Sequence, residues 1–86
     1  MKLCILYHPR SEYARKVEEF AHDFKHRNST DVQLVSLETR EGSATASLYD
    51  IVRYPAVLAL KENGELVKHW EGAELPLMAE VASYAA

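Results

Sequence analysis

Residues 49–60 read YDIVRYPAVLAL, and they hold the most informative pattern in this chain. A proline disfavours the helical conformation in the residue before it, so a helix that approaches Pro55 must end before Tyr54. The five residues after the proline are all apolar, as expected of a strand covered on both faces. The stretch therefore predicts the end of a helix, a proline turn and a central strand over 56–60.

Regular structure is also predicted on both sides of this stretch. Before it, apolar residues at helical spacing predict a helix over 44–52, which follows a turn of the chain at Gly42. These apolar residues are Ala44, Leu48, Ile51 and Val52. After it, residues 62–64 read ENG, a turn signal, and residues 65–70 read ELVKHW. The second half of the chain is thus expected to contain a β-hairpin.

The first half of the chain predicts a strand–helix–strand unit. Residues 2–7 read KLCILY, a continuous apolar run typical of a central strand, and residues 31–37 read DVQLVSL, a second strand. Between them, residues 11–28 have the pattern of an amphipathic helix capped by Ser11. Its apolar residues are Tyr13, Ala14, Val17, Phe20, Ala21 and Phe24. Because such crossovers are right-handed, the two strands should be parallel.

A last helix is expected over 74–84, with Pro76 in its first turn, where a proline is tolerated. The order is then β-α-β-α-β-β-α within one domain, residues 1–86. We expect an α/β fold with a four-stranded mixed sheet, an antiparallel hairpin at one edge and helices on both faces.

Composition restricts the function. The chain has 86 residues, 48% of them hydrophobic and 27% charged, which indicates a folded domain. Its formal net charge of −3 gives no general attraction for phosphate backbones, so nucleic acid is not an expected partner. The apolar run at residues 3–7 is too short for a membrane span or a signal-peptide core. We therefore expect a cytoplasmic protein without a membrane partner.

Three side chains that could carry metal or thiol chemistry have simpler interpretations. Cys4 is the single cysteine, so the chain can form no intramolecular disulfide and no cysteine-based zinc site, and we expect a buried strand residue. His22 and His26 have the i, i+4 spacing of a two-histidine metal site, but no third ligand is indicated. A solvated helix face is the favoured interpretation, and no metal or other cofactor is expected.

The predicted order of elements resembles the thioredoxin-like superfamily in its smallest, glutaredoxin-sized form. Two stretches carry the resemblance. Residues 49–60, with the later Gly72, are similar to the family's stretch that leads through a cis-proline into the central strand. Residues 7–17, YHPRSEYARKV, are similar to the strand, loop and helix that carry Cys-Pro-Tyr-Cys in glutaredoxins. The resemblance implies a thioredoxin-like (glutaredoxin-type) fold and a cis bond between Tyr54 and Pro55.

The departures from the family motif bear on activity. In this alignment the motif is replaced by Ser11-Glu12-Tyr13-Ala14, so the two family cysteines fall on Ser11 and Ala14. A serine hydroxyl stays protonated and cannot form a mixed disulfide, and Ala14 offers no resolving thiol. We therefore expect no dithiol active site, and no catalytic residue is assigned.

The resemblance also implies a binding face. In the family, the loop at the cis-proline exposes backbone to an extended peptide or to glutathione. We expect a protein or peptide partner at this face, and Tyr54 could serve as an aromatic anchor. The candidate binding residues are His8, Arg10, Ser11, Tyr13, Tyr54 and Pro55.

The alternative is an enzyme that resembles glutathione transferases, in which Ser11 or Tyr7 assists a thiol supplied by the ligand. Residues 71–74 read EGAE, whereas glutathione-binding relatives have a Gly-Gly-x-x-Asp-like turn there, so support for glutathione is weak. Amide shifts during a glutathione titration would separate the two hypotheses.

Overall fold

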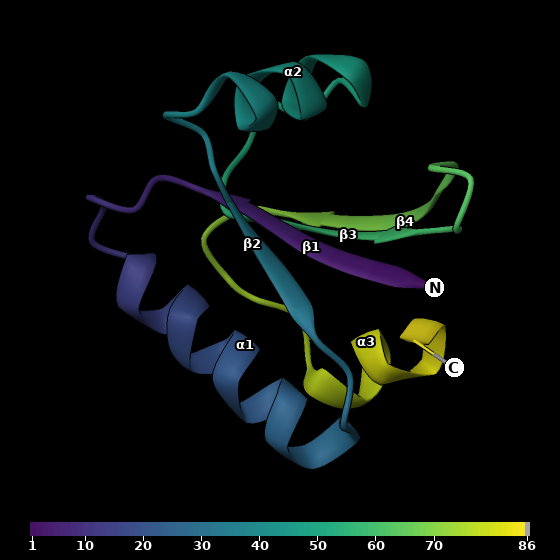
Figure 1. The fold of residues 1–86 in the computed structure, drawn as a ribbon. Helices are drawn as coiled ribbons and strands as arrows, with labels where there is room; N and C mark the ends of the chain where they lie inside the picture. Colours follow the sequence, from purple (N-terminus) through teal and green to yellow (C-terminus); the bar gives the residue numbers. More distant parts are fainter. Residues whose placement is uncertain (86) are drawn as a thin grey trace.

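The computed structural model describes residues 1–85 and has seven elements of regular structure (Figure 1). In chain order they are β1 (Lys2–Tyr7), α1 (Ala14–Asn28), β2 (Val32–Ser36), α2 (Arg40–Leu48), β3 (Ala56–Leu60), β4 (Leu66–Glu71) and α3 (Met78–Ala85). This order confirms the predicted β-α-β-α-β-β-α arrangement.

The four strands form one mixed sheet in the order β2-β1-β3-β4. β1 pairs in parallel with β2, with Ile5 beside Leu34, and antiparallel with β3, with Ile5 beside Val57. β3 and β4 form the predicted antiparallel hairpin, with a register irregularity between Ala59 and Leu60. The two strands with the longest apolar runs thus lie at the centre of the sheet.

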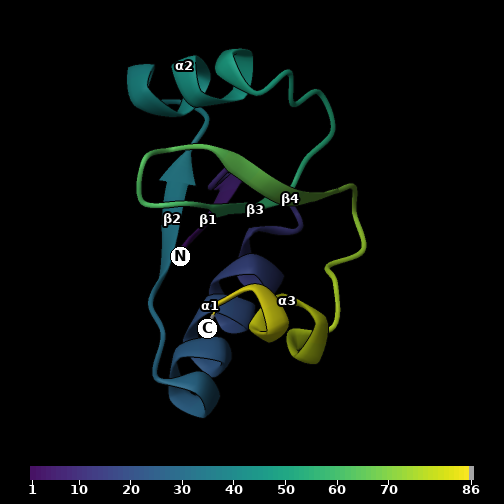
Figure 2. The same ribbon diagram turned by 90° about the vertical axis from the view of Figure 1, so that its right-hand side faces the viewer.

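Helices cover both faces of the sheet, as predicted: α1 and α3 lie on one face, and α2 lies on the other (Figures 1 and 2). Successive residues of a strand point to opposite faces, so β1 contributes to both cores. Leu3, Ile5 and Tyr7 pack against α1 and α3, whereas Cys4 and Leu6 pack against α2. The buried residues of α1 are Ala14, Val17, Phe20, Ala21 and Phe24.

The first helix begins three residues later than predicted. It starts at Ala14 after Tyr13, and no side chain caps it. Ser11 does not act as the cap, because its hydroxyl and its N–H both donate to the carbonyl of His8, at 2.6 and 3.1 Å. These bonds hold residues 8–11 in a turn, which delays the helix.

The position predicted for the second helix was wrong. α2 begins at Arg40, where the side chain of Thr39 accepts a hydrogen bond from the N–H of Gly42 at 3.0 Å. Gly42 is therefore a buried helical residue and not a turn. The helix ends at Leu48, so two apolar residues assigned to its buried face are exposed, Leu48 by 72% and Val52 by 77%. Ala44 is exposed as well, and only Ile51 of the predicted set is buried.

The third helix also starts later than predicted. α3 begins at Met78, and its first backbone acceptor is the carbonyl of Leu77, which receives the N–H groups of Glu80 and Val81 at 3.1 Å. Pro76 therefore lies in the preceding loop and not in the first turn of the helix. In the described residues, no helix combines the length and the apolar character needed to cross a bilayer.

Candidate functional site

The predicted site residues come from two loops at one end of the sheet. β1 and β3 are antiparallel neighbours, with Leu6 beside Ala56. The loop that follows β1, residues 8–13, and the end of the segment that leads into β3, residues 51–55, must therefore meet at the same end of the sheet. This end also receives the N-terminus of α1 (Figure 1).

His8 is the centre of this cluster. Its ring meets the ring of Tyr54 edge to face, with centroids 5.7 Å apart. The backbone N–H of His8 donates to the hydroxyl oxygen of Tyr13 at 3.2 Å, and the backbone carbonyl of His8 accepts a hydrogen bond from the Ser11 hydroxyl. The structure thus brings together four of the six residues predicted to form the binding face.

Tyr54 and Pro55 are held by the chain around them. The Tyr54 hydroxyl donates to the carbonyl of Ile51 at 2.7 Å, and the ring is half-buried against the α2 side of the core. Pro55 is buried, its bond to Tyr54 is cis, and its carbonyl accepts the N–H of Gly72 at 3.1 Å. The aromatic ring of Tyr54 is therefore held beside His8 at one end by its hydroxyl hydrogen bond and at the other end by the backbone around Pro55.

Arg10 lies apart from this cluster. Its Nε is 3.8 Å from Oε1 of Glu38, and its side chain is 88% exposed. A contact of this length between exposed groups is weak, so Arg10 retains freedom to move. Its positive charge lies beside Glu38 and is exposed to solvent.

A cavity of about 350 Å³ opens beside the His8–Tyr54 pair. The sequence did not point to its other lining residues, which are Leu37, Ser43, Ala46, Ser47 and Ile51. The i, i+4 pair Ser43 and Ser47 would have been found if α2 had been placed at 40–48, because that spacing puts both on one helix face. The lining is mixed, because it combines apolar side chains with the imidazole of His8 and with hydroxyl groups.

A smaller cavity of about 250 Å³ lies beside Tyr13. Its other lining residues are Glu12, Lys16 and Ala73. Ala73 follows Gly72, whose N–H binds the Pro55 carbonyl, so this second cavity borders the same loop cluster.

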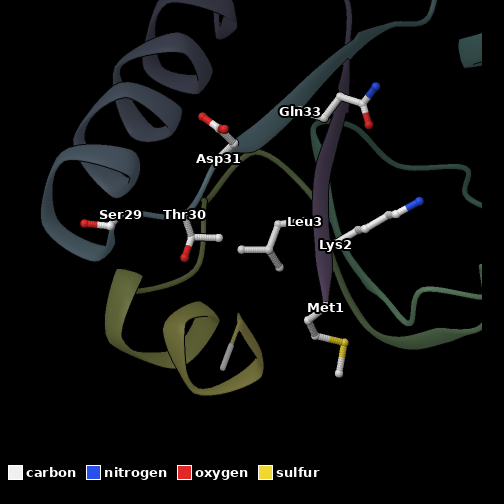
Figure 3. Close-up of a pocket in the computed structure, with 7 residues that line it drawn as sticks. All are labelled: Met1, Lys2, Leu3, Ser29, Thr30, Asp31 and Gln33. Carbon is white, nitrogen blue, oxygen red and sulfur yellow. The ribbon is translucent and has the colours of Figure 1, made fainter.

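Two larger hollows lie elsewhere on the surface. One, of about 540 Å³, lies over His22, Lys25, His26 and Ser29 at the C-terminal end of α1. The other, of about 610 Å³, lies at the start of β1 and β2 (Figure 3). Its polar side chains diverge: Ser29 points away from the strands, and Lys2 and Gln33 point to the opposite side. Ligand sites need converging polar groups, which the hollow in Figure 3 does not provide.

Three residues with a thiol or hydroxyl group lie in β1 or directly after it. Burial, and then the charge of Glu41, raise the pKa of the Cys4 thiol to about 11, so the thiol stays protonated at neutral pH. Burial and the neighbouring Glu18 raise the pKa of Tyr7, whose hydroxyl donates to that carboxylate at 3.3 Å. The Ser11 hydroxyl donates to the carbonyl of His8. Within residues 1–85, no group of three or more potential ligand side chains could hold a metal ion.

Comparison with known proteins supports the fold. No family model matches the chain, and no curated protein is significantly similar in sequence. Among solved structures, thioredoxin 1 from the thermophilic eubacterium Thermosipho africanus TCF52B superposes with a TM-score of 0.70 over 98% of this chain and 89% of that chain. The fold is thioredoxin-like. Sequence identity to that thioredoxin is 12%, so the comparison establishes the arrangement of the thioredoxin-like chain and not its activity.

Proposed function

We propose that this thioredoxin-like chain is a binding module without dithiol–disulfide exchange activity. In this proposal it holds an extended segment of a partner protein against the loops that carry His8 and Tyr54. The first part of the proposal follows from thiol chemistry, and the second follows from the geometry of the two loops.

The number of thiols and their burial support the absence of exchange activity. Exchange by a dithiol mechanism requires an attacking and a resolving thiol, and the sequence contains one cysteine. That cysteine is buried in β1 on the side of α2. By the resemblance, the family's thiol positions are Ser11, in the turn after β1, and Ala14, the first residue of α1.

The observation that carries the binding proposal is the His8–Tyr54 ring pair beside an open cavity. The two rings are fixed on different loops, so they present a rigid aromatic edge with little conformational entropy to lose on binding. The cavity of about 350 Å³ beside them has room for one side chain of a bound segment, and its lining combines apolar side chains with polar groups. An aromatic anchor next to a small pocket is the typical centre of a protein interface.

Selection from a random-peptide library tests this proposal without knowledge of the natural partner. We expect the wild-type chain to enrich a family of peptides that the Tyr54→Ala variant binds at least about tenfold more weakly. Tyr49→Ala is the matched control, because Tyr49 is also half-buried and its hydroxyl also binds a backbone carbonyl, that of Gly64 in the β3–β4 turn at the opposite end of β3. Failure to enrich any peptide, or equal loss of binding in both variants, would refute the binding role.

Two solution assays test the remaining parts of the proposal. With dithiothreitol as reductant, the chain should not accelerate insulin reduction above a Cys4→Ser variant, and turnover that depends on Cys4 would contradict inactivity. In a glutathione titration, we expect no saturable amide shifts at Ser11, Tyr54 or the residues beside Pro55. Saturable shifts there would instead favour the glutathione-dependent enzyme.

A further inference from the structure

The two outer strands of the sheet differ in how they are protected from pairing with other strands. β4 reads LVKHWE, carries charged residues and has a register irregularity beside Ala59 and Leu60. Charges and bulges of this kind oppose edge-to-edge association. β2, at the other edge, reads VQLVS and has no charge, proline or glycine. One edge of the sheet is therefore protected, and the other is not.

The direction of the backbone groups along β2 can be read from one hydrogen bond. The N–H of Leu37 donates to the carbonyl of Tyr7 in β1 at 2.9 Å. Backbone N–H and C=O groups of successive residues point to opposite sides of a strand. Since the N–H of Leu37 points toward β1, the N–H and C=O groups of Val32 and Leu34 point away from β1. The N–H of Ser36 also points away from β1. The carbonyl of Ser36 is already bound by the N–H and the hydroxyl of Thr39, at 3.2 and 2.7 Å.

We propose that β2 pairs antiparallel with β2 of a second copy of this chain, about a two-fold axis at Leu34. A two-fold axis perpendicular to a sheet must pair one residue of the strand with the same residue of the second copy, because paired residues have to point to the same face. Leu34 is the middle residue of the strand. About this axis, the N–H of Leu34 in each copy donates to the C=O of Leu34 in the other copy. The N–H of Ser36 in each copy donates to the C=O of Val32 in the other copy.

The charges beside β2 favour a second copy as the occupant. Lys25 of α1 lies at the start of the strand, where its Nζ is 2.9 Å from Oδ1 of Asp31. Glu18 of α1 lies at the other end, because it binds the Tyr7 hydroxyl and Tyr7 is in register with Ser36. The two-fold axis exchanges the two ends of the strand. It therefore brings the acidic Glu18 end of one helix toward the Lys25 end of the other, without placing like charges opposite each other across the paired strands.

The side chain at the axis suits this contact. Leu34 is 37% exposed on the face covered by α1. In the dimer the two Leu34 side chains become direct cross-strand neighbours, which removes apolar surface from water. A continuous sheet across both copies would result.

The mass of the chain in solution, measured by sedimentation equilibrium from micromolar to millimolar concentration, tests the proposal. We expect the mass of the wild type to rise toward twice the monomer mass. Leu34→Lys should raise the dissociation constant at least about tenfold, because it places like charges opposite each other at the axis. The matched control is Val67→Lys on β4, since Val67 is 38% exposed and the change is of the same kind. It should leave the dissociation constant unchanged.

A crosslinking experiment keeps the proposal testable if Leu34→Lys fails to fold. Hydrogen-bonded antiparallel pairs have Cα atoms about 5.5 Å apart, which a disulfide can bridge. In a Cys4→Ala background, Leu34→Cys should therefore form a covalent dimer on mild oxidation faster than Val67→Cys does. The proposal is overturned by a wild type that stays monomeric throughout, by a dimer that Leu34→Lys does not weaken, or by equal crosslinking of the two cysteine variants.

Discussion

The ring of Tyr54 meets the ring of His8 edge to face, with their planes at 81° to each other. This contact joins the loop after β1 to the loop before β3. Each residue also makes a hydrogen bond. The Tyr54 hydroxyl donates to the Ile51 carbonyl, and the backbone N–H of His8 donates to the Tyr13 hydroxyl. The two loops are therefore held as one surface before any ligand arrives.

This contact predicts an energetic coupling between the two rings. In a double-mutant cycle of His8→Ala and Tyr54→Ala, we expect a coupling of about 0.5–1 kcal/mol in the free energy of unfolding, as measured for other edge-to-face pairs. Urea denaturation of the four proteins measures it. Strictly additive effects of the two substitutions would mean that the rings are neighbours without being coupled.

The raised pKa of Cys4 predicts a pH dependence of stability. Its thiol ionises near the ordinary value of 9.0 in the unfolded chain and at about 11 in the folded chain, so the folded state binds more protons between these values. The free energy of unfolding should thus fall by about 2–3 kcal/mol as the pH rises from 9 to 11, and keep its full value below pH 9. Tyr7, whose pKa is also raised, contributes a loss of the same sign at the upper end of this range.

The Cys4→Ala variant isolates the thiol's part of this effect. Its stability should fall less steeply across the same pH range, because only Tyr7 and the other alkaline groups remain. Denaturant titrations at several pH values compare the two proteins. Identical slopes for both would show that Cys4 ionises at its ordinary pKa in the folded chain.

Restoring two cysteines tests the alignment with the family motif. Ser11 and Ala14 lie in one turn, in which the Ala14 N–H donates to the Ser11 carbonyl at 3.3 Å. We expect the Ser11→Cys, Ala14→Cys variant to form an intramolecular disulfide on mild oxidation, because Cα atoms in such a turn are about 5–6 Å apart. Mass spectrometry after alkylation detects it. Free thiols or intermolecular dimers alone would show that this loop does not correspond to the family's cysteine loop.

Gly42 provides a test of the α2 packing. Replacing a helical glycine by alanine ordinarily stabilises a protein by roughly 0.5–1 kcal/mol. A Cβ atom on Gly42 would instead overlap the carbonyl of Ser36, at the end of β2. We expect Gly42→Ala to lower the free energy of unfolding by about 1–3 kcal/mol, the usual cost of overpacking.

Ser43→Ala, at the next and exposed position, serves as the control for Gly42→Ala. It should change stability by only a few tenths of a kcal/mol, because the position is exposed and alanine is a better helix former than serine. Thermal or urea denaturation of both variants supplies the comparison. A gain in stability for Gly42→Ala would show that α2 packs less closely on the strand end than described.

The contrast between α1 and α2 explains which parts of the fold could be predicted from sequence. The buried face of α1 consists of large apolar residues at helical spacing, such as Phe20 and Phe24, and that pattern identified it correctly. The buried residues of α2 are Gly42 and Ala46, and at Gly42 the helix lies too close to the end of β2 for a side chain. Small residues give no hydrophobic periodicity, so the apolar spacing predicts a buried face that includes Leu48 and Val52, which are exposed.

The candidate site could also be predicted only in part. Residues in the two loops could be named because the proline at position 55 and the family resemblance pointed to them. The contact of His8 with Tyr54 depends on the antiparallel pairing of β1 with β3, which joins segments far apart in the sequence. The sequence does not assign Ser43 and Ser47 to the cavity, because the apolar spacing predicts a helix that starts at residue 44, whereas α2 starts at Arg40.

A partner segment is proposed to bind at the surface formed by His8 and Tyr54. The most direct test is an amide-shift map of the isotope-labelled chain with a peptide selected on it. We expect saturable shifts in residues 8–13, at Tyr54 and at Gly72 and Ala73, with the Tyr54→Ala variant binding at least about tenfold more weakly and Tyr49→Ala binding as the wild type does. Shifts confined to α1 or to the edge of β2, or an unchanged affinity in Tyr54→Ala, would contradict the claim.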